Sequence, residues 1–441
     1  MNLSTSGPAI QQHLPPTLVE DQPIREKRKS KPRWLLLAFE VCLLAIILHA
    51  ITSFIWSPQF LTLGDVIEYH QYALAFWTQA PLFHQFPQEY PPLALLPFTF
   101  TLSPFSGILY YWAFAFWIGV IICLSYLWLA RMASHRTALA YALYLLVGAM
   151  ATLLMRYDLL PALATFGALL LAERKRYAWA YAMLAVGVLL KLYPAFLLPV
   201  LMAAEWRERS AIGSTTQNRQ KERYRLLWQR GRPMLKNLGT FAALVVLGFG
   251  LPLAINTLQV TSVFTYNLER PIQIESLPGS LLWLGTFFGF PVQGVISFGS
   301  LNLIGPLEDL LKLLSSVGLV AGSLLVYWRV WRGQLALGQA FLAAVGVILI
   351  CNKVLSPQYL IWILPLVAYV VGFDLLWFLI CLLNTLIYPF LYHVYYHVDN
   401  EITNPVLLGV IAARNAALIV AVVRAVLGKP AWPRILKGIN G

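Results

Sequence analysis

Three basic residues stand between long apolar segments, where a charged side chain is costly unless it is paired or hydrated. They are Lys191, Arg270 and Lys353. If they converge on one cavity, they could bind an anion, most simply a phosphate group. The alternative is that each side chain reaches the membrane interface by itself or pairs with a nearby glutamate. Polar residues follow or flank all three: Tyr193, Gln273, Glu275, Ser276, Asn352 and Gln358.

A second group of candidate residues is acidic and lies in the first polar segment after an apolar run. Asp65 opens this group, Glu68 follows three positions later, and Glu89 and Tyr90 stand near the end of the segment. An Asp before a helical sequence fits an N-cap, whose side chain accepts a hydrogen bond from the first turn. The same Asp also fits a general base at the mouth of a cavity. Both interpretations stay open at this point, and one residue could serve as both.

Arg156 and Asp158 flank Tyr157 between two apolar runs, at a predicted tight turn. Their opposite charges favour an ion pair within the turn, and contact with a ligand is the alternative. A third polar segment carries His393, His397 and Asp399.

The spacing of these two histidines could place both imidazoles on one helix face, as a metal site needs. Tyrosines are interleaved with them, which favours an aromatic belt at a membrane interface. We therefore predict no metal site.

The composition is that of a membrane protein. Of the 441 residues, 59% are hydrophobic and 12% are charged, whereas soluble domains carry roughly 25% charged residues. The net charge of +13 could indicate a nucleic-acid partner. However, the basic residues lie in short clusters between apolar runs, as the positive-inside rule expects. We predict contact with membrane lipid and no nucleic-acid partner.

The apolar runs predict an all-α polytopic protein with about twelve transmembrane helices and both termini in the cytoplasm. A helix needs roughly 20 apolar residues to span the bilayer, and the runs 159–172, 178–190 and 192–204 are shorter. They could span only if the polar residues between them lie at a water-filled cavity. The predicted segments are a disordered cytoplasmic tail (1–30), a transmembrane domain (31–430) containing a first outer loop with interfacial helices (57–104), a basic cytoplasmic loop (205–236), a second outer region (259–305) and a third outer loop (392–404), and a cytoplasmic C-terminal tail (431–441).

Several motifs together resemble a known family. An apolar run, then Gly64-Asp65, then a loop closing on Glu-Tyr-Pro-Pro-Leu at 89–93, resembles the polyprenol-phosphate-sugar-dependent glycosyltransferases of the GT-C fold. Four further stretches resemble glycosyltransferase family 87. They are RYDLLP at 156–161, KLYP at 191–194, ERPIQIESL at 269–277 and NKVLSPQY at 352–359. The resemblance covers about residues 34–365, so the third outer loop and the last helices match no motif.

This resemblance implies transfer of a sugar, most often mannose, from a polyprenyl-phosphate donor to a hydroxyl of a glycolipid or glycan acceptor. The reaction would take place at the non-cytoplasmic face of the plasma membrane, as a single inverting displacement without metal or cofactor. Asp65 matches the presumed base of the family. Lys191, Arg270 and Lys353 would hold the donor phosphate. The candidate sugar- and acceptor-binding residues are Glu68, Glu89, Tyr90, Arg156, Asp158, Tyr193, Gln273, Glu275, Ser276, Asn352 and Gln358.

A transporter or flippase for a lipid-linked or anionic substrate is the main alternative, because it also needs cations in a cavity. Such a protein should have polar residues along a path between both faces. The polar residues within the predicted spans are few, chiefly Asn384, Arg414 and Asn415. This asymmetry favours an enzyme that works from one face.

Overall fold

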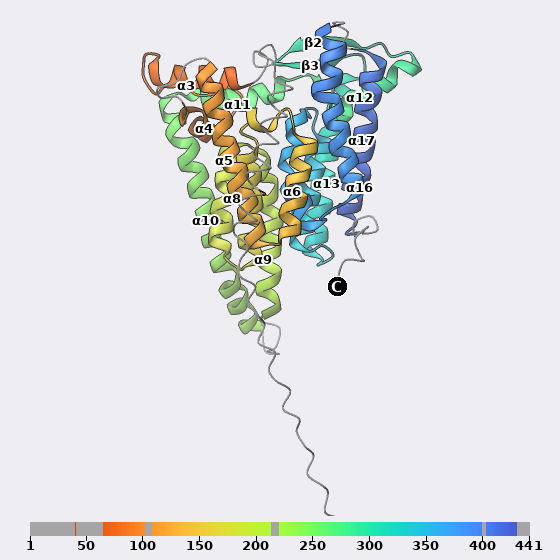
Figure 1. Cartoon of the computed structure of the whole chain (residues 1–441). Coiled ribbons are helices and arrows are strands. Elements are labelled where there is room, and N and C mark those ends of the chain that lie inside the picture. The colour runs from red at the N-terminus through yellow and green to blue at the C-terminus, as the bar shows by residue number, and fades with distance from the viewer. Residues whose placement is uncertain (1–39, 41–64, 102–107, 213–219, 399–402, 430–441) are drawn as a thin grey trace, which may run out of the picture.

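The computed structural model describes residues 40, 65–101, 108–212, 220–398 and 403–429. In this part of the chain the protein is an upright bundle of helices with a small sheet at one end, which we call the sheet end (Figure 1). The first helices are α3 (Val66–Thr78), η1 (Pro92–Ala94), α4 (Leu95–Thr99), α5 (Ile108–Met132), α6 (His135–Gly148), η2 (Leu153–Met155), α7 (Leu159–Glu173), α8 (Tyr177–Leu190), η3 (Tyr193–Leu197), α9 (Leu198–Ile212) and α10 (Gln220–Ile255).

The second half of the chain returns to the sheet end before it completes the bundle. Its elements are α11 (Thr257–Glu269), β1 (Ile272–Gln273), α12 (Leu277–Gly285), η4 (Thr286–Phe288), β2 (Gln293–Ser297), β3 (Ser300–Ile304), α13 (Glu308–Trp331), α14 (Leu337–Cys351), η5 (Pro357–Trp362), α15 (Leu364–Val370), α16 (Leu375–Thr385), η6 (Leu386–Val398) and α17 (Pro405–Val426). Helices α3 and α4 form where the sequence predicts helices in the first outer loop, and both lie at the sheet end (Figure 1).

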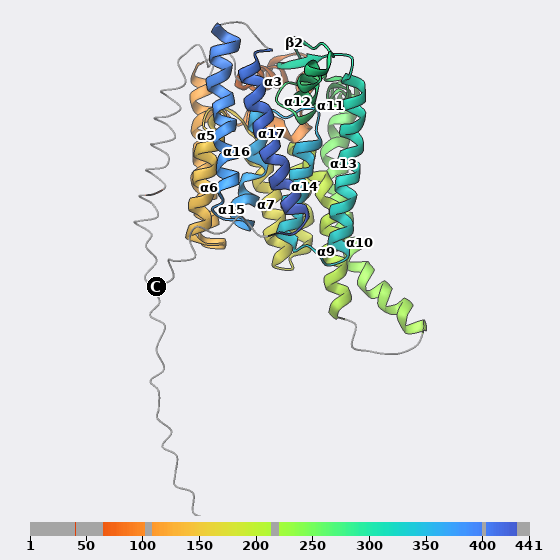
Figure 2. The ribbon, with the colours of Figure 1, turned by 90° about the vertical axis from the view of Figure 1, so that its right-hand side faces the viewer.

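Among the described residues, five helices are long and apolar enough to cross a membrane. They are Leu109–Met132, Gly231–Ile255, Glu308–Trp331, Leu375–Tyr395 and Pro405–Val426. The count of about twelve spans is therefore not confirmed, and the first predicted span (34–56) lies outside the described residues except for residue 40. Helices α5, α9, α13 and α17 each carry an arginine in the last turn, away from the sheet end (Figure 2). The charge asymmetry of the sequence is thus an asymmetry between the two ends of the bundle.

The shorter apolar helices have a structural role that explains their length. Helix α7 has 15 residues, α8 has 14 and α14 has 15. Each meets a polar residue at one end: Asp158 precedes α7, Lys191 follows α8, and Asn352 follows α14. Helices α7 and α8 pack extensively against each other. Because these three buried helices are short, the polar residues at their ends lie inside the bundle.

The structure of two connecting segments differs from the sequence prediction. Residues 205–236 are largely helical rather than a loop, because α9 continues to Ile212 and α10 begins at Gln220. Region 259–305 contains an antiparallel sheet of three strands in the order β1-β3-β2, so the protein is not strictly all-α. The turn between β2 and β3 consists of Phe298 and Gly299, both with positive φ, as a tight hairpin turn requires.

Buried hydrophobic residues form two clusters in the described part of the chain. The larger cluster fills the bundle around α6, α7, α8, α14 and α15. The smaller one joins the sheet and α12 to η6 and α17, with Ile272, Leu303, Ile387 and Ile411 at 0% exposure. The sheet is consequently packed onto the last helices of the chain.

Candidate functional site

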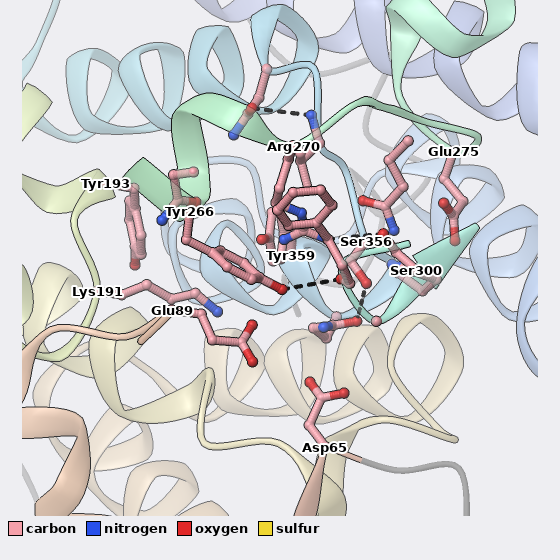
Figure 3. Close-up of a pocket in the computed structure, with 18 of the residues that line it drawn as sticks. Asp65, Glu89, Lys191, Tyr193, Tyr266, Arg270, Glu275, Ser300, Ser356 and Tyr359 are labelled. Atoms are coloured by element: carbon pink, nitrogen blue, oxygen red, sulfur yellow. Dashed lines mark hydrogen bonds between the residues drawn. The ribbon is translucent and has the colours of Figure 1, made fainter. Parts of the chain in front are cut away.

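A cavity of about 580 Å³ opens at the sheet end between α3, α11, η3, η5, η6 and the sheet. Most of the predicted site residues line it although they come from distant parts of the sequence. They are Asp65, Glu68, Glu89, Tyr90, Arg156, Lys191, Tyr193, Arg270, Gln273, Glu275, Asn352 and Gln358. Figure 3 shows the side chains of Asp65, Glu89 and Lys191 directed toward one shared space, with Glu275 on the other side of the view.

Three predicted residues do not line the cavity, and each has another partner. Lys353 turns away, and its Nζ donates a hydrogen bond to the carbonyl of Leu268 in the last turn of α11 at 2.7 Å. Ser276 is the N-cap of α12, where its Oγ accepts a hydrogen bond from the backbone N–H of Gly279. Asp158 is 1% exposed and lies beneath Lys191. The prediction that Lys191, Arg270 and Lys353 converge on one cavity therefore holds only for the first two.

Asp65 faces the cavity rather than capping α3. It occupies the N-cap position, but its side chain makes no capping hydrogen bond. Its Oδ1 instead accepts from Nη2 of Arg156 at 3.0 Å, and the Arg156 side chain is 8% exposed. A buried guanidinium fixes the direction of the carboxylate it pairs with, because the hydrogen-bonding geometry is planar. The capping interpretation of Asp65 was wrong, and so was the pairing of Arg156 with Asp158.

Lys191 lies in a cage of aromatic rings above Asp158. Its Nζ is 2.5 Å from Oδ1 of Asp158, which also accepts from Nε1 of Trp362. The ammonium is 4.9 Å from the ring centre of Tyr359 and 5.2 Å from that of Tyr157. An ammonium has three N–H donors, so the pairing with Asp158 leaves donors for a ligand. The site thus holds a positive charge whose position is fixed from several sides.

Arg270 ends α11 and supplies the second cavity cation. Its guanidinium stacks on the ring of Tyr266 at 5.6 Å, and Nη2 donates to Oγ of Ser300 on β3 at 3.1 Å. Its buried Nε has no hydrogen-bond partner within the described chain. A buried donor without a partner costs about 1–3 kcal/mol. The Nε of Arg270 is therefore available to donate a hydrogen bond to a ligand in the cavity.

Glu68 and Glu89 form a carboxyl pair beside Asp65. Burial, together with the charges of Glu68 and Asp65, raises the pKa of Glu89 to about 8. Burial and the charge of Asp65 also raise the pKa of Glu68. The raised pKa favours the protonated form of the Glu89 carboxyl, which donates the hydrogen bond that joins the pair.

This pair predicts a stability that depends on pH. The folded-state pKa of Glu89 exceeds the usual 4.5, so the folded protein holds a proton that the unfolded chain releases at lower pH. The contribution of Glu89 is present below about pH 4.5 and is lost as the pH rises through about 8. We expect the apparent unfolding temperature of the wild type to fall more than that of Glu89→Gln between about pH 6 and about pH 9. Parallel curves for the two proteins in detergent would contradict this assignment.

Several aromatic residues that line the cavity were not predicted, among them Tyr359, Trp362, Tyr388 and Tyr392. The rings of Tyr193, Trp362 and Tyr359 form a continuous stack, with centroid separations of 4.3 Å and 4.0 Å. Tyr388 and Tyr392 on η6 also line the cavity. Tyr359 ends one of the quoted motifs, which was a usable signal.

The tyrosines of the third outer loop had instead been assigned to an interfacial belt. His393 lies exposed on η6. The side chain of His397 and residue Asp399 lie outside the described residues.

The chemistry of the cavity follows from its charges. Carboxyl groups from the first outer loop face Lys191 and Arg270, and the lining also includes apolar residues from α13, α14 and η3: Leu319, Ile348 and Phe196. Such a cavity can accept a molecule with an anionic group, several hydroxyls and an apolar part. It also holds an acid or base close to fixed cations.

Some of the residues that line the cavity lie in a segment that matches the model of a known protein family. Residues 89–216 match the model of glycosyltransferase family 87. The resemblance predicted from the motifs is thereby confirmed, and the match indicates a glycosyltransferase. The matched segment contributes Glu89, Arg156, Lys191 and Tyr193 to the cavity, whereas Asp65 and the residues after α10 lie outside it. A search of curated proteins finds no match to the chain.

Proposed function

We propose that the protein transfers a sugar, mannose in the first instance, from a polyprenyl-phosphate donor to an acceptor hydroxyl. The observation that carries this proposal is the cavity in which the Asp65 carboxylate shares one space with Lys191 and Arg270. A lipid phosphate as leaving group calls for fixed cations, which stabilise developing negative charge without any proton transfer. The apolar lining from α13, α14 and η3 suits the isoprenoid part of the same donor.

The proposed reaction is a single displacement at the anomeric carbon. Asp65 accepts the proton of the acceptor hydroxyl as its oxygen attacks, and the bond between the anomeric carbon and the phosphate oxygen breaks. The polyprenyl phosphate leaves with the electron pair, and Lys191 and Arg270 stabilise its charge. The configuration at the anomeric carbon is inverted. Glu68, Glu89, Gln273, Glu275, Asn352 and Gln358 are the candidate contacts of the sugar and acceptor.

We further propose that the sheet end faces outward from the plasma membrane and that the termini are cytoplasmic. The arginines at the opposite ends of α5, α9, α13 and α17 support this orientation through the positive-inside rule. The acceptor would then be a glycolipid or glycan of the cell envelope.

The direct test is to incubate the purified protein with polyprenyl-phosphate sugars and a panel of glycolipid acceptors, with products identified by mass spectrometry. Transfer of one sugar with inverted anomeric configuration is the expected result. Movement of the intact lipid-linked sugar across a vesicle membrane, without any new glycoside, would instead support the flippase alternative.

Arg270→Ala is expected to weaken donor binding. A hydrogen bond to a charged group contributes about 1.5–3 kcal/mol, so the dissociation constant should rise by roughly 10- to 100-fold. Binding of polyprenyl-phosphate mannose in detergent checks the prediction. Lys353→Met is the matched control, because Lys353 does not line the cavity and its Nζ donates to the backbone carbonyl of Leu268. Equal losses of donor affinity in both variants would indicate that Lys353 also binds the donor phosphate. This result would contradict the assignment of phosphate binding to the residues that line the cavity.

A further inference from the structure

Arg414 is the largest side chain that is fully buried in the described part of the chain, and it lies within α17. Its Nη2 donates to the backbone carbonyl of Glu275 at 2.6 Å, and its Nη1 donates to Oδ1 of Asn384 on α16 at 2.9 Å. A guanidinium inside a spanning segment costs several kcal/mol unless it is paired. This one is directed at the backbone of a residue that lines the cavity.

Two neighbours hold the same residue. Nδ2 of Asn415 donates to the Glu275 carbonyl at 3.1 Å and to Oγ of Ser280 at 2.8 Å. The hydroxyl of Tyr392 on η6 donates to Oε1 of the Glu275 carboxylate. The last helices of the chain therefore contact both the backbone and the side chain of Glu275.

The loop that carries Glu275 is also held from its other side. Ser276 caps α12, and its hydroxyl donates to the carbonyl of Gln273 at 2.7 Å. Gly279 packs so closely that a Cβ there would lie 2.5 Å from that carbonyl oxygen. The loop thus has little freedom to move.

Two of the buried atoms that remain without a partner in this network point to a ligand. Oε2 of Glu275 and Oε1 of Gln273 are buried acceptors with no hydrogen-bond partner among the described residues, and both residues line the cavity. Buried acceptors are costly to leave unpaired. Two of them at one side of a cavity suit a molecule that presents neighbouring hydroxyl donors, such as a sugar ring.

We infer that Arg414, Asn415 and Tyr392 are positioning residues that aim the Glu275 carboxyl group at a sugar hydroxyl. The last helices of the chain, which match no motif of the family, are thereby part of the sugar-binding site. The identity of the ligand as a sugar rests on the proposed function. The positioning of Glu275 rests on the hydrogen bonds described above.

The first experiment compares two buried tyrosines in the sugar-transfer reaction. Tyr392→Phe removes the hydroxyl that holds Glu275. Tyr141→Phe removes one that contacts Ser125 between α5 and α6, and Tyr141 is 0% exposed. We expect Tyr392→Phe to raise KM for the sugar substrate by about 3- to 10-fold with kcat changed less, and Tyr141→Phe to leave both unchanged.

Combining Tyr392→Phe with Glu275→Gln should give less than the product of the two single effects, since one acts through the other. Arg414→Lys should retain more activity than Arg414→Met, because only the lysine can still donate to the Glu275 carbonyl. Strictly multiplicative effects, or equal effects of Tyr392→Phe and Tyr141→Phe, would overturn the inference.

A second measurement requires no transfer activity. Burial raises the pKa of Glu275 to about 7, while the hydrogen bond from Tyr392 and the charges of Arg414 and Arg270 act to lower it. Tyr388 also faces this carboxyl group. The infrared carbonyl band of the protonated carboxyl, assigned by its absence in Glu275→Gln, gives the midpoint of its titration. Tyr392→Phe should move this midpoint to higher pH, and Tyr141→Phe should not.

The two measurements separate the possible failures. A wild type without transfer activity but with the expected infrared shift would refute the proposed function and retain the positioning of Glu275. An active wild type in which Tyr392→Phe leaves the titration and KM unchanged would refute the positioning and retain the function.

Discussion

Asp65→Asn is expected to lower the rate of sugar transfer by about 100- to 10,000-fold, the usual contribution of a general base. An amide cannot accept the proton of the acceptor hydroxyl, whereas the carboxylate can. The Asp65 side chain is 26% exposed, and its Oδ1 lies 3.0 Å from Nη2 of Arg156. The amide oxygen of the variant can still accept this hydrogen bond. Expression and the apparent unfolding temperature should therefore stay close to those of the wild type. Single-turnover transfer from polyprenyl-phosphate mannose measures the effect.

The matched control for this variant is Asp309→Asn. Asp309 stands in the first turn of α13, its side chain is fully exposed and it lies outside the cavity lining. It should transfer sugar at the wild-type rate. Turnover of Asp65→Asn within a factor of about three of that rate would remove Asp65 as the base, because a general base typically contributes at least about 100-fold.

Replacing the ion pair of Lys191 and Asp158 with a neutral pair should lower transfer by about 100- to 1,000-fold, as loss of one stabilising donor does in other enzymes. The change must be made in both residues. Removing Lys191 alone leaves Asp158 buried without its cation, and breaking a buried pair in this way costs roughly 3–5 kcal/mol. The double variant Lys191→Gln with Asp158→Asn retains a hydrogen bond between the two positions, so the bundle should fold. The readouts are kcat and the apparent unfolding temperature.

A second ion pair supplies the comparison for the double variant. Lys175 and Glu208 are joined at 2.7 Å away from the cavity, and the Lys175 side chain is 70% exposed. The double variant Lys175→Gln with Glu208→Gln should leave kcat unchanged, because the pair lies away from the cavity. Its apparent unfolding temperature should change little, since exposed pairs contribute about 0–1 kcal/mol to stability. If the double variant of Lys191 and Asp158 folds and has the wild-type kcat, Lys191 does not stabilise the leaving phosphate group.

The gathering of polar residues at one end of the bundle was predictable from the sequence. Asp65, Arg156, Lys191 and Arg270 stand at ends of apolar runs that share one face of the predicted topology, and all four line the cavity. Their partners were not predictable in the same way. Arg156 pairs with Asp65 rather than with its neighbour Asp158, because the packing of α7 and α8 brings Asp158 under Lys191. Sequence proximity is a poor guide where helices from distant segments meet.

Other differences have equally local causes. Lys353 adjoins Asn352, which lines the cavity, yet its own side chain donates to the carbonyl of Leu268 in the last turn of α11. A difference of one position decides which way a side chain faces at the end of a helix. The hairpin of β2 and β3 was missed because its turn begins with Phe298, whereas asparagine or aspartate usually occupies that position. The strands themselves, Gln293–Ser297 and Ser300–Ile304, are too short to stand out within an apolar chain.

The cavity is lined by residues that extend from Asp65 near the beginning of the described chain to Tyr392 near its end. During synthesis, Asp65, the proposed base, therefore leaves the ribosome more than 300 residues before Tyr392. A nascent or truncated chain that stops before η6 has the acid and the cations but lacks one side of the cavity. The cavity is complete only in a chain translated through η6, so the order of synthesis would delay the proposed activity until that helix has been made.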